Sequence, residues 1–261
     1  ISTHTPMLTR SLPDTSLRYV KRNADETREI LVGGEDINAL CAKELGVLPD
    51  HNVKLFIGVE GPNDIAFLQN ISKALINDGE DILNLEQLEI DGQIIFFPLG
   101  GSTLMLWNAR LEALGRPEFH LYDRDHEPPK EAKYKSAVDA VNARSNCCAL
   151  STAKKEMENY IHCECINEAY SKFSIALAIS KNFDSFADTP VEVAKLVHAD
   201  SDSNKPWHDL AEDNRSQKER RVKKVLNGSA ARLMTRARLA EIDKDGELLS
   251  WFTQMKTLMA D

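Results

Sequence analysis

The chain is predicted to be an α/β protein, with a parallel sheet flanked by helices and an additional, mostly helical subdomain. Two observations on the 261-residue sequence predict this class. Between residues 53 and 150, short apolar runs alternate with helical patterns, which is typical of βαβ units. Beyond residue 154 the strand signals vanish and helical patterns continue to residue 259.

The first elements follow from apolar runs that end at turn signals. A buried strand is expected at 53–59, because Val53 to Val59 is apolar and Gly61-Pro62 follows it. A helix at 63–77 comes next. A second apolar run at 94–99 precedes a helix at 102–114, and the next strand spans 118–122.

The loop containing Pro128 and Pro129 interrupts this alternation. After it we expect a helix at 131–144, a short strand at 147–150, and helices at 156–180, 190–199, 209–226 and 235–259. Residues 1–50 are expected to hold a strand end, a loop and a linker, with a short helix at 37–46.

Composition excludes a membrane protein and favours a cytoplasmic one. The chain is 42% hydrophobic and 28% charged, as in ordinary globular proteins, and no apolar run is long enough to cross a bilayer. The five cysteines are odd in number and irregularly spaced, which favours free thiols in a reducing compartment. The first residues carry neither a start Met nor a signal peptide, so we expect a fragment of a longer cytoplasmic protein.

The charge is unevenly distributed. The net charge is −9, but residues 215–238 contain nine basic residues and one acid, so this segment carries +8 and the rest of the chain −17. Such asymmetry indicates a polyanion-binding face, although a solvated helix face is the alternative. The candidate DNA contacts are Arg215, Lys218, Arg220, Arg221, Lys223, Lys224 and Arg232.

Acidic residues stand where two of the apolar runs stop. Glu60 and Asp64 follow the first run, and Asp123 and Asp125 follow the run at 118–122. If the two strands are neighbours these carboxylates converge, because ligands bind outside the carboxyl ends of parallel strands. Asp123 and Asp125 also face the same way if the strand stays extended. Clustered carboxylates repel one another unless a cation neutralises them, so the sequence predicts a Mg²⁺-type site. Asp64 alone could equally be a helix cap.

The two acidic motifs together carry a family resemblance. E-G-x-x-D at 60–64 and D-x-D at 123–125 resemble the Toprim fold of topoisomerases, bacterial primases, recombination-repair proteins and OLD (overcoming lysogenization defect) nucleases. The stretch K-E-M-E-N-Y at 155–160 looks like the E-x-E-N-Y of OLD nucleases, which implies that Glu158, or Glu156, completes a second metal site.

Two further segments resemble parts of OLD proteins, in which an ABC-type ATPase precedes a Toprim nuclease. I-S-T-H-T-P at 1–6 resembles the switch loop of the ATPase, where His4 would sense the γ-phosphate. K-K-V-L-N at 223–227 resembles a segment that returns to the nuclease site, where Lys223 or Lys224 would stabilise charge on the scissile phosphate. The sequence has no G-x-x-x-x-G-K-[ST] loop, so ATP is expected to act only through an upstream ATPase domain.

The resemblance implies an organisation into four parts. Residues 1–50 would be the end of the ATPase domain and a linker, and residues 51–160 the Toprim core. Residues 161–210 would form a helical insertion, and residues 211–261 a basic helical segment that returns to the core.

The function implied is that of a DNA endonuclease with two Mg²⁺ or Mn²⁺ ions. Glu60, Asp64 and Glu158 would hold one ion, and Asp123 and Asp125 the other. The expected partners are DNA, the chain's own ATPase domain and a second copy of the chain. An RNA-cutting enzyme and a non-catalytic nucleic-acid-binding or dimerisation module remain as alternatives.

Overall fold

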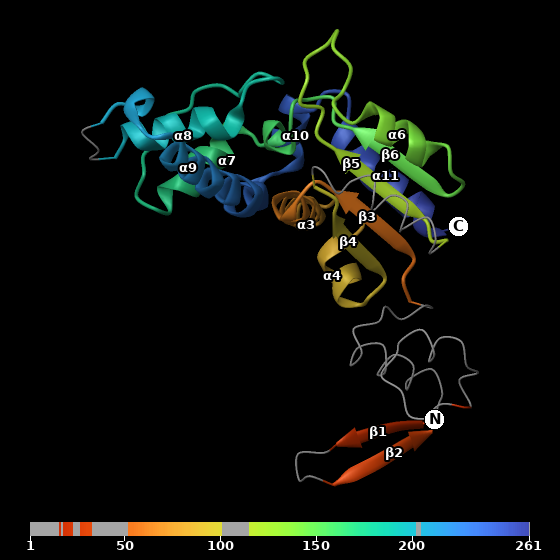
Figure 1. Cartoon of the computed structure of the whole chain (residues 1–261). Helices are drawn as coiled ribbons and strands as arrows, with labels where there is room; N and C mark the ends of the chain where they lie inside the picture. Colours follow the sequence, from red (N-terminus) through yellow and green to blue (C-terminus); the bar gives the residue numbers. More distant parts are fainter. Residues whose placement is uncertain are drawn as a thin grey trace. The chain divides into compact units, whose positions relative to one another are not determined.

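The computed structural model describes residues 16, 18–22, 27–32, 52–100, 115–201 and 205–260. The chain divides into two units, residues 1–53 and residues 54–261. In the first unit, β1 (Arg18–Arg22) and β2 (Arg28–Val32) pair as an antiparallel two-stranded sheet (Figure 1). His4 and the predicted helices at 37–46 and 102–114 lie outside the described residues.

The second unit is built on a four-stranded parallel sheet with the order β4-β3-β5-β6. Its strands are β3 (Leu55–Val59), β4 (Ile94–Pro98), β5 (Glu118–Tyr122) and β6 (Cys147–Ser151). Every residue of β3 and β5 is buried, as expected for strands covered on both faces. The predicted α/β class, a parallel sheet flanked by helices, is therefore confirmed and is consistent with a Toprim-type fold.

Helices lie between the strands in the sequence, and every regular element described after β6 is helical (Figure 1). Near the sheet lie α3 (Pro62–Asn77), α4 (Leu85–Ile90) and α6 (Lys135–Asn142). After β6 come η3 (Met157–Tyr160), α7 (Cys163–Ser171), α8 (Thr189–Ala199), η4 (Trp207–Asp209), α9 (Glu212–Val225), the π-helical η5 (Leu226–Ala230), η6 (Ala231–Leu233), α10 (Arg236–Ile242) and α11 (Glu247–Ala260).

The prediction of one helix over 156–180 is wrong. The chain is extended at Ile161, and His162 then caps α7 by accepting a hydrogen bond from the amide of Glu164. After α7 the backbone enters the left-handed region at Ser174, with φ 60°, and residues 175–188 form no helix. Apolar residues continue through this stretch because the non-helical chain also packs on the core, for example at Ile175 and Leu177.

Two expectations from composition can be compared with the structure. None of the helices among the described residues is long and apolar enough to span a bilayer. The cysteines within the described ranges are free thiols, namely Cys147, Cys148, Cys163 and Cys165.

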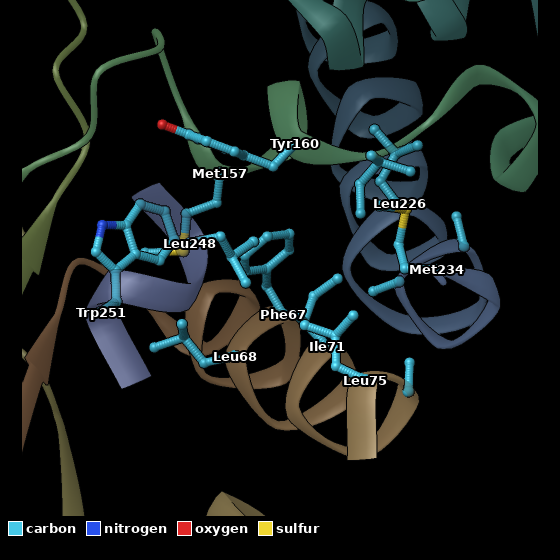
Figure 2. Close-up of a cluster of buried hydrophobic side chains, with 14 of the residues drawn as sticks. Phe67, Leu68, Ile71, Leu75, Met157, Tyr160, Leu226, Met234, Leu248 and Trp251 are labelled. Carbon is cyan, nitrogen blue, oxygen red and sulfur yellow. The ribbon is translucent and has the colours of Figure 1, made fainter. Parts of the chain in front are cut away.

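The main core packs α3 against η3 and against helices of the C-terminal third of the chain (Figure 2). The α3 side chains Phe67, Leu68, Ile71 and Leu75 recur at helical spacing and are completely buried. Around them lie Met157, Tyr160, Leu226, Met234, Leu248 and Trp251. Since η3 and η5 both join this core, Glu158, which follows Met157, comes into contact with Asn227, which follows Leu226.

The opposite face of β5 carries a buried polar network. The imidazole of His120 bonds Glu118 Oε2 through Nε2 (2.8 Å) and the Tyr122 hydroxyl through Nδ1 (2.7 Å). Arg144 donates to both oxygens of Glu118, each at 2.8 Å. Burial alone would raise the pKa of Glu118, but the His120 and Arg144 hydrogen bonds outweigh it, and the pKa is lowered. Such satisfied networks tolerate little displacement.

Gly58 lies against this network, and its replacement by alanine is expected to destabilise the fold. A Cβ there would lie 2.5 Å from Leu99 Cδ1 and 3.0 Å from His120 Nδ1. Because both neighbours are fully buried, we expect a loss of about 1–3 kcal/mol in the free energy of unfolding, measured by urea denaturation. Gly61→Ala is the control, since a Cβ at Gly61 meets nothing within 4 Å. Equal losses in the two variants would contradict the steric account.

Candidate metal centre

The site begins where β3 and β5 end side by side. The two strands are neighbours paired in parallel, with Gly58 opposite His120, so the condition for the carboxylates to converge is met. Glu60 follows β3 and Asp123 follows β5. The backbone amide of Asp123 donates to Glu60 Oε1 at 2.9 Å, so the two residues are in direct contact at the carboxyl edge of the sheet.

Asp64 adds a carboxylate from the first turn of α3. Its Oδ2 accepts a hydrogen bond from the amide of Gly61 at 2.8 Å, and the helix dipole favours a negative charge there. Asp64 is nevertheless buried, with 8% of its surface exposed. Burial, followed by the charges of Glu158 and Glu60, raises the pKa of Asp64 to about 7. Asp64 therefore both caps α3 and belongs to the acidic cluster.

Glu156 and Glu158 enter from the segment after β6. The amide of Met157 donates to Asp123 Oδ1 at 3.2 Å, which fixes η3 beside the end of β5. Glu156 is 7% exposed and Glu158 is 1% exposed. Within the described part of the chain, Glu156 Oε1 and Glu158 Oε2 are buried without a hydrogen-bond partner. An unpaired buried carboxylate oxygen is costly, and a cation bound at these two atoms would remove that cost.

Lys223, at the end of α9, supplies a positive charge to the cluster. Its Nζ donates to Glu156 Oε2 at 2.7 Å and lies 3.6 Å from Glu158 Oε1. Burial alone would lower the pKa of Lys223, but Glu158 and Glu156 outweigh it and the pKa is raised. The neighbouring Lys224 is exposed. Of the two lysines left open by the sequence, the structure places Lys223 at the carboxylates.

The carboxylates interact strongly with one another. Burial raises the pKa of Asp123 well above its ordinary range, and further increases come from Asp64, Glu158, Glu60 and Glu156. Burial followed by the charge of Glu158 likewise raises the pKa of Glu156. The pKa of Glu60 is raised mainly by burial. A buried site in which neighbouring acids raise the pKa of Asp64, Asp123 and Glu156 favours binding of a cation.

Asp125 differs from the other acids in being paired with a surface lysine. Its φ of 59° takes the chain out of the extended conformation, so the prediction that Asp123 and Asp125 face the same way does not hold. The Asp125 carboxylate accepts a hydrogen bond from Lys133 Nζ at 2.6 Å. It remains close enough to Glu60 to raise the pKa of that carboxyl, after the larger effect of burial.

Two residues at the site were not predicted as site residues. The Tyr134 hydroxyl donates to Glu60 Oε2 at 3.2 Å, and Asn227 Nδ2 donates to Glu158 Oε1 at 2.7 Å. Asn227 ends the K-K-V-L-N segment, which was a usable signal. Nothing in the sequence around Tyr134 indicates its role.

The basic residues lie mostly along α9, the helix that ends at the cluster. Arg220, Arg221 and Lys224 are exposed, while Arg215 and Lys218 are partly exposed. Arg232, on η6, is also exposed, and its Nε donates to Asn70 Oδ1 at 2.7 Å. A positively charged helix surface therefore leads towards Lys223 and the carboxylates.

The donor set fits a hard divalent cation. Every acidic group is a carboxylate, the ligand type that Mg²⁺ and Mn²⁺ prefer, and two of the oxygens are unpaired. Among the described residues, no group of three or more His, Cys, Asp or Glu side chains is arranged so that it could hold a metal ion without rearrangement. The agreement with a hard cation therefore lies in the type of ligand and in the two unpaired oxygens.

No family model, curated protein or solved structure matched this chain, so the comparisons assign neither a family nor a function. Inference about function thus depends on the residues of the site.

The acidic cluster predicts how pH affects the metal-free protein. Folded Asp64, with a pKa of about 7, keeps a proton that the unfolded chain releases near the ordinary value of 3.8. Its contribution to stability is therefore complete at low pH and is lost as pH rises through about 7. In EDTA we expect the melting temperature to fall between about pH 4 and pH 7, with a free-energy change on the order of a few kcal/mol.

Calorimetric melting across this range checks that expectation. Mg²⁺ should restore stability at pH 8, and Asp64→Asn should flatten the pH dependence. A melting temperature that rises with pH in EDTA would contradict the account.

Proposed function

We propose that this chain is a metal-dependent phosphodiesterase that cleaves DNA by a two-metal mechanism. The observation that carries the proposal is the pair of buried, unpartnered oxygens of Glu156 and Glu158 within a cluster drawn from the ends of β3 and β5, from α3 and from η3. The residues proposed to hold Mg²⁺ or Mn²⁺ are Glu60, Asp64, Asp123, Glu156 and Glu158. Asp125, whose Oδ2 accepts a hydrogen bond from Lys133, would join them through Oδ1.

The chain's own residues have distinct proposed roles. When bound, two divalent ions would neutralise charge on the scissile phosphate and supply an activated water. Glu60 is oriented by the amide of Asp123 and by the Tyr134 hydroxyl. Lys223 holds a fixed positive charge beside Glu156, where it can bind an oxygen of the phosphate and stabilise charge that develops there.

DNA is the proposed substrate because cations follow α9 to the site. Lys and Arg side chains of this kind bind phosphates irrespective of sequence. The same carboxylates would serve for RNA, so an RNA substrate is an outcome that the experiments must distinguish. The resemblance to OLD nucleases agrees with this proposal. It adds three further proposals: an upstream ATPase domain that controls cutting, a homodimer, and a cytoplasmic location.

Titration calorimetry with Mn²⁺ tests the metal centre without any substrate. We expect the chain to bind two ions, and Glu60→Gln to weaken or abolish binding of at least one of them. Asp139→Asn is the control, because Asp139 is a surface carboxylate with 61% of its side chain exposed. Absence of binding by the folded protein would rule out the proposal.

A further inference from the structure

The segment η5 is a π-helix inserted where α9 ends, and its Asn227 points into the acidic cluster. Asn227 is buried, with 1% of its surface exposed. Its Nδ2 donates to Glu158 Oε1 at 2.7 Å and to the carbonyl oxygen of Lys223 at 3.0 Å. Single-turn π-helical segments recur at functional sites. One amide thus holds both a carboxylate and the backbone that carries the lysine.

Asn227 is itself held by a hydrogen-bonded chain that reaches the surface. Its backbone carbonyl oxygen accepts from Asn70 Nδ2 at 2.8 Å, and Asn70 Oδ1 accepts from Arg232 Nε at 2.7 Å. Asn70 belongs to α3, the helix that also carries Asp64, and η5 and η6 pack on this helix. The chain of bonds from Arg232 to Glu158 therefore joins η6, α3, η5 and η3.

The two carboxylate oxygens of Glu158 have different surroundings. Oε1 is fixed by Asn227, whereas Oε2 is buried without a partner among the described residues. A neutral amide orients the carboxylate without neutralising it, so Glu158 keeps its capacity to bind a cation. The Lys223 ammonium, by contrast, lies closer to Glu156 than to Glu158.

We propose that Asn227 is a positioning residue for the metal ligand Glu158, and that Asn70 and Arg232 hold Asn227 in place. The inference rests on the proposed function, because it assigns Glu158 to a metal. Groups that hydrogen-bond a metal ligand fix its orientation, and their loss costs roughly 10- to 100-fold in metal affinity or activity. Arg232 thereby has a structural task besides any contact with DNA.

Mn²⁺ calorimetry and cleavage kinetics on Asn227→Ala test the proposal. We expect Mn²⁺ affinity to fall by roughly 10-fold or more, and kcat to fall while KM for DNA stays within about 2-fold. Asn70→Ala should give a smaller loss of the same kind. The matched control is Asn167→Ala, which removes two hydrogen bonds to Ile179, at 2.9 and 3.1 Å, and should change stability but not Mn²⁺ affinity.

The outcomes separate this inference from the proposed function. If the parent chain binds Mn²⁺ and folded Asn227→Ala binds it equally well, the positioning role is wrong and the metal centre stands. If the parent chain binds no Mn²⁺, the proposed function itself fails. Should Asn227→Ala not fold, Asn70→Ala decides, since unchanged Mn²⁺ affinity in that variant overturns the role of the hydrogen-bonded chain.

Discussion

Asp123→Asn is expected to abolish cleavage and, at the same time, to stabilise the metal-free protein. Asn keeps the shape of Asp123 and can still accept the hydrogen bond from the amide of Met157. It removes the negative charge that a divalent cation requires, so we expect activity to fall by roughly 10²–10³-fold or more.

The gain in stability follows from the charge that Asp123 carries in the fold. Burial, and then the neighbouring acids, raise its pKa well above the ordinary range, so ionised Asp123 destabilises the folded state at pH 8. Removal of that charge should raise stability in EDTA by on the order of 1 kcal/mol. Thermal melts and cleavage assays on the same preparation check both effects, with Asp139→Asn as the surface control. An active variant would contradict the role of Asp123 as a metal ligand. A variant less stable than the parent in EDTA would contradict the destabilising effect of its charge.

Lys223→Met should reduce both activity and stability, whereas Lys224→Met should leave stability unchanged and reduce cleavage only modestly, through weaker DNA binding. Methionine preserves much of the lysine stem but removes the ammonium group that donates to Glu156. Loss of one partner of a fully buried ion pair costs roughly 3–5 kcal/mol. Because 34% of the Lys223 side chain is exposed, we expect about 1–3 kcal/mol here. Cleavage should fall by roughly 10²–10³-fold, since the charge at the phosphate is lost.

The adjacent lysines form a matched pair for this experiment. Both lie in the last turn of α9, but Lys224 is exposed. Urea denaturation at pH 8 and single-turnover cleavage should therefore separate Lys223 from Lys224. Similar losses in both variants would show that charge on the helix, rather than contact with Glu156, is responsible.

The parallel sheet could be predicted because its strands are short apolar runs followed by turn residues. The strand at 118–122 was predicted with the bounds that β5 has, and the helix at 63–77 differs from α3 by one residue at its start. The helix α4 and the antiparallel pairing of β1 with β2 were not predicted. The end of α7 was also missed. Ile175 and Leu177 are partly buried against the core, so the apolar pattern continues although the helix has ended.

Pattern alone could predict only those site residues that directly follow the ends of strands. Glu60 and Asp123 meet because parallel neighbouring strands end at one edge, and family resemblance brought in Glu158. The position of Asp125 depends on a local left-handed turn that the motif does not encode. Tyr134 and Asn227 bond acids 74 and 69 residues away along the chain, so their roles arise from tertiary packing.

The most direct test of the metal-centre account is the nicking of supercoiled plasmid by this chain with Mg²⁺ or Mn²⁺, without ATP, beside Asp123→Asn, Asp139→Asn and an EDTA control. The account predicts nicking that requires the metal, persists in Asp139→Asn and is lost in Asp123→Asn. A single-stranded RNA substrate in parallel distinguishes the two nucleic acids. Nicking that survives in Asp123→Asn would contradict the metal centre, and a folded protein that binds Mn²⁺ yet cuts neither DNA nor RNA would contradict the proposed nuclease activity.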